Sequence, residues 1–119
     1  MPRFVVLTHD HRFLHWDFML EKEAGLRTWR LPHAPGGMGV MTAEPLAEHR
    51  LVYLDYEGPV SGDRGTVHAF DRGEYIVVEE SGDSFVVQLS GAKLMGQASI
   101  RRQSATGGWT FEFRPGRDS

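Results

Sequence analysis

The residues best suited to chemistry lie close together near the start of the sequence, in the segment His9-Asp10-His11-Arg12-Phe13-Leu14-His15-Trp16-Asp17. On an extended strand, His15 and Asp17 project from the same face about 6.5 Å apart, because the rise is about 3.3 Å per residue. Both side chains can therefore reach one ion. On a straight strand His9 would lie about 20 Å away. A shared site thus requires the chain to reverse near residues 10–12.

Two imidazoles and one carboxylate form a ligand set that leaves positions open for water or for an oxygen atom of a substrate. The sequence has no cysteine, so any bound metal ion needs nitrogen and oxygen ligands, which suits Mn²⁺, Zn²⁺ or Fe²⁺. The alternative interpretation is that the three residues are unrelated polar side chains on a half-exposed strand. The spacing alone is compatible with both interpretations.

The elements that must position these residues are short β-strands, because β-branched and aromatic runs alternate with glycine and proline. We expect strands at Arg3–His9, Phe13–Glu21, Leu26–Leu31, Arg50–Tyr56, Thr66–Phe70, Tyr75–Glu79, Phe85–Leu89, Ser99–Gln103 and Trp109–Arg114. One helical turn is expected at Thr42–Glu48. A chain-reversing turn between two strands is expected at Asp71-Arg72-Gly73. This pattern indicates an all-β fold, a small closed or partly open β-barrel with at most one short helix, and we expect the histidine site on its floor.

The bulk properties favour one domain spanning residues 1–119, because 119 residues with 40% hydrophobic content can bury one core. The first apolar run, Phe4–Leu7, is too short for a membrane helix or a signal peptide. A net charge of −3 gives no overall basic field for nucleic acid. We therefore expect a cytoplasmic monomer without membrane association, whose tail Pro115–Ser119 is frayed.

Several segments also match a known family in order along the chain: Phe4–Glu21, Thr28–Pro35, Glu48–Gly58, Gly65–Gly73 and Gly91–Gly96. They resemble the 3′-phosphoesterase domain of bacterial DNA ligase D and its stand-alone relatives. That family opens with F-V-[VI]-x-x-H-x5-H-x-D-F-R-L-E and continues with S-W-x-[VL]-P-K-G-P and E-D-H-P-L-x-Y-x-x-F-E-G. Blocks that cover most of the chain in the expected order are more specific than any single motif.

The resemblance implies a compact β-barrel that holds Mn²⁺ through His9, His15 and Asp17, with Zn²⁺ as the alternative ion. His49 and Tyr53 match family positions that contact the substrate phosphate, and they are the implied catalytic residues. A divalent ion polarises phosphoryl oxygens, and a neighbouring imidazole can donate a proton as charge develops. The implied partners are a nucleic acid 3′ end or a small phosphorylated substrate, together with DNA repair proteins.

Three further positions bear on this resemblance. Glu21 matches the acidic end of the first block, and we expect it to orient a ligand histidine. Met19 stands where the family has an arginine, and His33 where it has a lysine. Methionine cannot form the paired hydrogen bonds of a guanidinium with phosphate. The candidate replacement cations are Arg12, Arg27, Arg30, Arg50 and Arg64, of which Arg50 is the weakest because adjacent strand residues point to opposite faces.

Three functional hypotheses follow from these residues. The first is a metal-dependent phosphoesterase that hydrolyses phosphate or ribonucleotide at nucleic acid 3′ ends. The second is a catalytically weakened module of the same fold that binds metal and phosphate without turnover, as the loss of the arginine at Met19 suggests. The third is a cupin-like metal barrel that acts on a small carboxylate or sugar.

Overall fold

The computed structural model describes residues 1–37 and 39–116. Within them the chain forms strands and one short 3-10 helix, η1. The elements are β1 (Arg3–His9), β2 (His15–Lys22), β3 (Gly25–Leu31), β4 (Val40–His49), η1 (Leu51–Leu54), β5 (Gly58–Pro59), β6 (Thr66–Glu80), β7 (Ser84–Gly91), β8 (Met95–Arg102) and β9 (Trp109–Pro115). The expected all-β fold is confirmed. Residues 117–119 of the tail expected to fray lie outside the described residues.

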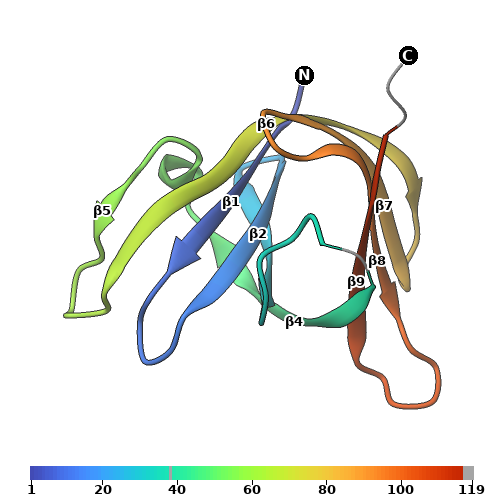
Figure 1. The fold of residues 1–119 in the computed structure, drawn as a ribbon, viewed down its shortest axis with the longest axis horizontal. Helices are drawn as coiled ribbons and strands as arrows, with labels where there is room; N and C mark the ends of the chain where they lie inside the picture. Colours follow the sequence, from blue (N-terminus) through green and yellow to red (C-terminus); the bar gives the residue numbers. More distant parts are fainter. Residues whose placement is uncertain (38, 117–119) are drawn as a thin grey trace.

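The strands form one antiparallel sheet in the order β1-β2-β3-β4-β9-β8-β7-β6-β5 (Figure 1). The sheet closes into a barrel because β1 also pairs with β6, from Arg3 opposite Glu74 to His9 opposite Val67. β5 pairs only with the start of β6 among the described strands, so it lies outside the ring. Closure leaves few free edges, which protects a sheet of this length from pairing with other chains.

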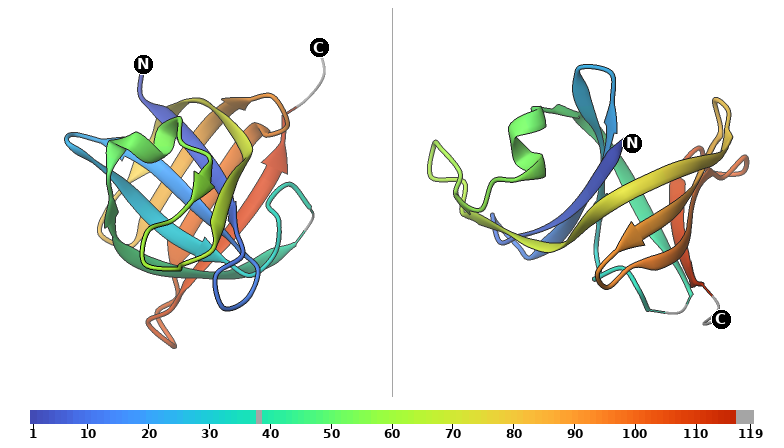
Figure 2. Two further views of the ribbon diagram at one scale, coloured as in Figure 1. Left: turned by 90° about the vertical axis from the view of Figure 1, so that its left-hand side faces the viewer. Right: turned by 90° about the horizontal axis from the view of Figure 1, so that it is seen from above.

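Hydrophobic side chains occupy both faces of the wall formed by β1, β2 and β3. One set fills the barrel interior and includes Phe4, Val6, Phe18, Leu20, Trp29, Leu31, Phe85, Val87, Leu89, Ile100 and Phe111. The other set covers the outer face beneath η1 and consists of Val5, Leu7, Met19, Leu26, Leu54 and Val67. In Figure 2, η1 and β5 lie on the opposite side of β1 from the barrel interior. The wall is therefore buried on both sides, which fixes its position.

Two expectations about the middle of the chain are wrong. Residues 42–48, expected as a helical turn, belong to the strand β4, most of whose side chains are exposed. Exposure on both faces removes the two-residue alternation by which a strand is recognised. The segment Arg50–Tyr56, expected as a strand, contains η1 instead. Its apolar run is consistent with either structure, and Leu54 is the η1 residue that packs into the outer cluster.

The expected turn at Asp71-Arg72-Gly73 is also wrong, because β6 runs without a break from Thr66 to Glu80. Gly73 is there for close packing rather than for a turn. A Cβ atom added to Gly73 would lie 2.1 Å from the carbonyl oxygen of Ser90 on β7. Glycine within a strand often marks such a close approach of two backbones.

Candidate metal centre

The β1–β2 hairpin brings the two ligand-type histidines together. His9 and His15 are paired Cα partners at the end of the hairpin, so their side chains lie on the same face. The loop between them reverses the chain with a positive φ of 63° at Arg12 and a 2.8 Å hydrogen bond from Phe13 N to His11 O. The predicted reversal near residues 10–12 is confirmed. β2 begins at His15 rather than at Phe13, because the loop occupies residues 10–14.

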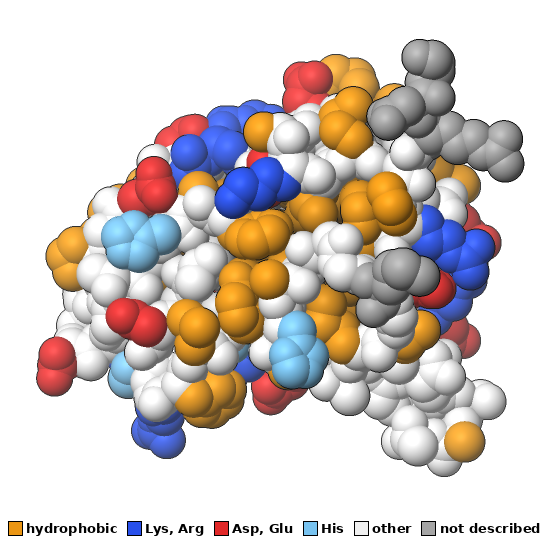
Figure 3. All heavy atoms as spheres, in the orientation of Figure 1, with side chains coloured by type: hydrophobic (Ala, Val, Ile, Leu, Met, Phe, Trp, Pro, Cys, Tyr) orange, Lys and Arg blue, Asp and Glu red, His pale blue; other side chains and the backbone are white. Residues whose placement is uncertain are grey.

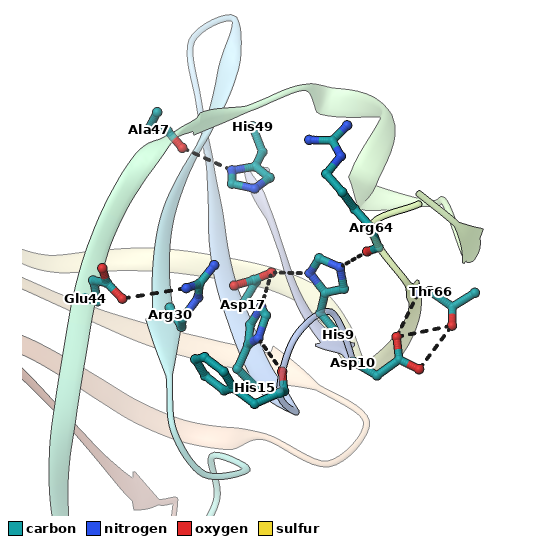
Figure 4. Close-up of polar contacts among 11 residues, drawn as sticks. His9, Asp10, His15, Asp17, Arg30, Glu44, Ala47, His49, Arg64 and Thr66 are labelled. Atoms are coloured by element: carbon teal, nitrogen blue, oxygen red, sulfur yellow. Dashed lines mark hydrogen bonds and ion pairs between the residues drawn. The ribbon is translucent and has the colours of Figure 1, made fainter. Parts of the chain in front are cut away.

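His9, His15 and Asp17 converge on one point (Figure 4). Asp17 Oδ2 lies 3.5 Å from His9 Nδ1 and 3.5 Å from His15 Nε2. The three potential ligand atoms all lie within 4.8 Å of one another. The site lies on the outer face of the barrel rather than on its floor, because His15 and Asp17 alternate with Phe18 and share the face of Met19.

Backbone carbonyls fix the orientation of both imidazoles. His9 Nε2 lies 2.7 Å from the carbonyl oxygen of Arg64, and His15 Nδ1 lies 3.1 Å from that of Phe13. A carbonyl only accepts hydrogen bonds, so each of these nitrogens carries the proton. In the neutral rings, the other nitrogen of each histidine then presents a lone pair to Asp17. Such hydrogen bonds from the second nitrogen are typical of metal-ligating histidines.

The acceptor atoms of the site lack hydrogen-bond donors. His15 Nε2 and Asp17 Oδ1 are buried and have no hydrogen-bond partner among the described residues. Burial lowers the pKa of His15 below its ordinary value, which favours the neutral ring. Two lone pairs beside a buried carboxylate repel one another unless a cation lies between them.

The spacing also suits a divalent cation better than direct ion pairs. A charge-assisted N–H···O bond is about 2.7–2.9 Å long, shorter than the 3.5 Å observed for both histidines. Two ligand atoms that each lie about 2.1 Å from one ion at a tetrahedral angle are about 3.4 Å apart. The residues therefore fit an ion of the nitrogen- and oxygen-binding class, which includes Mn²⁺, Zn²⁺ and Fe²⁺.

The structure also places His49 and Tyr53 at this site. Both line a cavity of about 100 Å³ together with His9 and Asp17. Their rings meet edge to face with centroids 5.9 Å apart. His49 Nδ1 donates to the carbonyl oxygen of Ala47 at 3.0 Å, so Nε2 is the atom that the neutral or protonated ring offers to a further partner. β4 and η1 thus supply two polar groups above the histidines of the β1–β2 hairpin.

Glu21 does not lie at the site. Its Oε1 accepts a 2.9 Å hydrogen bond from the backbone N–H of Arg3, near the other end of the hairpin. The ligand-type histidines are oriented by the carbonyls of Phe13 and Arg64 instead. Sequence inspection cannot find such groups, because every residue has a carbonyl. Of Phe13 and Arg64, the sequence identifies only Arg64 as a candidate site residue, because its side chain is a cation.

A comparison with known proteins identifies the family of the chain. The family model of the DNA ligase D 3′-phosphoesterase domain matches residues 7–102, which include the candidate site. The chain belongs to this family. The cupin-like alternative is thereby removed.

The curated relatives that the chain matches are much longer than this chain. The chain is 29% identical over 115 residues to the multifunctional non-homologous end joining protein LigD of Pseudomonas aeruginosa. It is 31% identical over 108 residues to the multifunctional non-homologous end joining DNA repair protein LigD of Mycobacterium tuberculosis. The matches cover 88% and 83% of this chain but only 14% of each relative.

The described residues contain no helix long and apolar enough to cross a membrane.

Proposed function

We propose that this chain is a metal-dependent phosphoesterase that removes a phosphate or a ribonucleotide from the 3′ end of a nucleic acid. The observation that carries the proposal is the convergence of potential ligand atoms from His9, His15 and Asp17 within 4.8 Å of one another, where His15 Nε2 and Asp17 Oδ1 are buried without a hydrogen-bond partner among the described residues. Membership of the 3′-phosphoesterase domain family supports the reaction class. Mn²⁺ is the proposed cofactor, and Zn²⁺ is the alternative.

The proposed mechanism assigns a task to each group of the cavity. When bound by the three residues, a divalent ion supplies polarisation of the phosphoryl oxygens. In the hydrolysis, the oxygen of a water molecule forms a bond to phosphorus while the bond from phosphorus to the leaving oxygen breaks. His49 is anchored through Nδ1 to Ala47, so a doubly protonated His49 can donate its Nε2 proton to that leaving oxygen as negative charge develops. Tyr53 lines the same cavity and can donate its hydroxyl proton in a hydrogen bond to a second phosphate oxygen.

The charge distribution favours contact with the end of a nucleic acid over broad duplex binding. The net charge of the chain is −3. On the face drawn in Figure 3, Lys and Arg side chains are interspersed with Asp and Glu and form no continuous basic area. Proteins that hold duplex DNA depend on many phosphate contacts. We therefore propose a small footprint at the 3′ terminus, and DNA repair proteins as partners, in line with the names of the LigD relatives.

A second candidate function is a module that binds metal and phosphate without turnover. The observation that favours it is Met19, which is 1% exposed and carries no charge at the position where the family pattern has an arginine. This alternative keeps the same ligands and the same cavity. It differs from the first proposal only in that the bound phosphoester is not hydrolysed.

The test is release of inorganic phosphate from a primer that ends in a 3′-phosphate, with Mn²⁺ or Zn²⁺ added to chelator-treated protein. We expect metal-dependent release that His9→Ala and His49→Ala abolish and that His68→Ala, an exposed histidine on β6, leaves unchanged. A primer with one 3′-terminal ribonucleotide tests the second substrate. Metal binding without product from either primer would support the binding module, and equal release without metal would contradict both proposals.

A further inference from the structure

The phosphate cavity needs a positive side chain that β2 does not supply. Met19 lines the cavity from below but belongs to the outer hydrophobic cluster with Val5 and Leu7. A phosphate monoester carries a charge of about −1.5 to −2 near neutral pH. The Asp17 carboxylate in the ligand set offsets one of the two positive charges of a divalent ion, so a further cation would help to hold the phosphate. The candidate arginines differ in whether they line the cavity and in which groups their side chains contact.

Three of these arginines do not line the cavity of His9 and Asp17. The guanidinium of Arg27 stacks 4.9 Å from the ring of Trp29, which belongs to the barrel interior and so to the opposite face. Arg12 is exposed at the tip of the hairpin loop. Arg50 lies 5.9 Å from the ring of Tyr53 and lines an adjoining pocket with His49 and Arg64. Arg50 is therefore near His49, but it does not share a cavity with the proposed metal ligands.

Arg30 is close to the site but does not line the cavity. It is the Cα partner of Asp17 on β3. Its Nη1 lies 3.9 Å from Glu44 Oε1, whereas its Nε is buried without a hydrogen-bond partner among the described residues. Figure 4 shows Arg30 and His9 on opposite sides of Asp17. Arg30 is therefore the competing cation, which the experiment must include.

Arg64 combines position with an available donor. Its side chain lines the cavity with His9, Asp17 and His49, and it extends toward the ring of His49 in Figure 4. Its Nε donates to Ser61 O at 2.7 Å, and its Nη2 donates to Ser61 Oγ at 3.3 Å. Among the described residues no carboxylate pairs with Arg64, so Nη1 keeps both of its protons for an anion.

The loop that carries Arg64 is fixed to the metal-ligand hairpin at two points. The carbonyl of Arg64 accepts the hydrogen bond from His9 Nε2. The second link is made by Thr66, whose backbone N–H donates to the side-chain oxygen Asp10 Oδ1 at 2.8 Å. Within the loop, Val60 N donates to Gly65 O at 2.8 Å. These bonds hold the backbone at residue 64 beside the proposed metal ligands, and the bonds to Ser61 restrain the side chain, which lowers the entropy cost of binding an anion there.

We propose that Arg64 is the phosphate-binding guanidinium of this chain and replaces, from the β5–β6 loop, the arginine that β2 lacks at Met19. This inference rests on the proposed function, because it assigns a residue to the same phosphate. It also specifies the ligand: a phosphoryl group that contacts the metal ligands on one side and His49 and Arg64 on the other.

The test compares Arg64→Ala and Arg64→Lys with the unmodified chain. Binding of inorganic phosphate to the Mn²⁺-loaded protein is measured by calorimetry, and KM and kcat are measured with the 3′-phosphate primer. We expect Arg64→Ala to weaken phosphate binding about 10- to 100-fold, in line with the loss of charge-assisted hydrogen bonds. Arg64→Lys should recover only part of the loss, because a lysine lacks the planar fork of donors. The Mn²⁺-induced rise in melting temperature should persist, since every variant keeps the backbone carbonyl at position 64.

Two controls separate position from net charge. Arg114→Ala removes the same charge from β9, and Arg30→Ala removes the competing cation beside Asp17. Both should change the phosphate affinity less than about threefold. Unchanged phosphate binding in Arg64→Ala, a larger loss in Arg30→Ala, or no phosphate binding by the unmodified Mn²⁺-loaded chain would overturn the inference.

The outcomes also distinguish this inference from the proposed function. If the unmodified chain releases phosphate from the primer and Arg64→Ala does so equally well at low substrate concentration, the role of Arg64 is wrong and the phosphoesterase proposal stands. If the unmodified chain binds inorganic phosphate through Arg64 but releases none from the primer, hydrolysis is wrong and the role of Arg64 stands.

Discussion

His9 and His15 face each other directly across the β1–β2 hairpin, with ring centroids 4.8 Å apart. Each ring presents one nitrogen to the same oxygen of Asp17. All three proposed ligands thus come from one hairpin whose strands are buried on both faces further along. A site on such rigid elements is positioned before a metal ion or a substrate arrives.

Metal binding should stabilise the fold measurably. An ion present at about 100 times its dissociation constant adds about 2.7 kcal/mol to the free energy of unfolding. For a domain of this size, that corresponds to a rise of about 10 °C in melting temperature. We expect this rise when Mn²⁺ is added to chelator-treated protein, measured by differential scanning fluorimetry, and its reversal by excess chelator.

The matched controls for the metal prediction are His15→Ala and His68→Ala. His15→Ala removes a buried ligand-type nitrogen, whereas His68→Ala removes an exposed histidine on β6. The first variant should lose the Mn²⁺ response and the second should keep it. An equal response in both variants would show that the ion binds elsewhere.

The conversion of Asp17 to asparagine should separate stability from metal binding. Without an ion, the Asp17 carboxylate faces two nitrogen lone pairs and its Oδ1 has no described donor. An amide NH₂ in its place can donate to one histidine nitrogen and removes a buried charge. Asp17→Asn should therefore unfold at higher urea in the presence of chelator, with a gain of about 1 kcal/mol.

The same variant should fail to respond to Mn²⁺, because an amide is a weaker ligand than a carboxylate and donates a proton where a lone pair is needed. Urea unfolding with chelator and with Mn²⁺ measures both effects. A loss of stability in chelator would mean that Asp17 is a structural carboxylate, and the proposal that it is a metal ligand would lose its main physical support.

The sequence predicts the β1–β2 hairpin of the site well, but it predicts poorly the elements that surround this hairpin. The expected strand at Arg3–His9 has the bounds of β1, and the predicted reversal at residues 10–12 is observed. The centre of β1 is a buried apolar run, so local residue types decide its structure. The reversal is predictable because a shared ion requires His9 to return beside His15. β4 is mostly exposed and contains Pro45, and its strand structure depends on pairing with β3 and β9. Pairing between strands that are far apart in sequence cannot be predicted from the residue pattern of β4 alone.

The same limit explains Glu21 and Arg64. The family pattern predicts that Glu21 orients a ligand histidine, yet its carboxylate accepts a hydrogen bond from the backbone N–H of Arg3. Arg64 is far from the histidines in sequence, yet its carbonyl holds His9. Its approach depends on the pairing of β1 with β6, which closes the barrel. Contacts that depend on barrel closure cannot be derived from local spacing.

Asp71 should be one of the main polar determinants of stability. Its buried carboxylate accepts hydrogen bonds from the backbone N–H groups of Ala92, Lys93 and Leu94 at 2.7–3.0 Å. Asp71→Ala leaves these donors without an acceptor and should lower the free energy of unfolding by about 3 kcal/mol. Asp71→Asn keeps one acceptor oxygen and should cost about half as much. Urea unfolding measures both.

The Asp71 variants should keep the Mn²⁺-induced rise in melting temperature, because the Asp71 carboxylate binds the loop at residues 92–94 and makes no contact with the proposed ligands. A loss below about 0.5 kcal/mol in Asp71→Ala would mean that water satisfies the loop donors as well as the carboxylate does.

Gly65 should couple the Arg64 loop to the hairpin of the metal site. Its φ is 73°, and a Cβ atom there would lie 2.6 Å from Asp10 Oδ1, the atom that accepts the hydrogen bond from Thr66 N. Gly65→Ala should therefore break this link and move the Arg64 loop. Gly107 is the matched control, since its φ is 74° and no atom lies within 4 Å of its added Cβ.

Both alanine variants carry the same backbone penalty of about 1 kcal/mol for a left-handed conformation. Only Gly65→Ala adds the clash with Asp10, so it should lose about 1 kcal/mol more than Gly107→Ala in urea unfolding. It should also weaken binding of inorganic phosphate to the Mn²⁺-loaded protein several-fold, because the guanidinium of Arg64 no longer lies beside His49. Equal losses of stability in the two variants, with unchanged phosphate binding, would show that the Asp10–Thr66 link does not position Arg64.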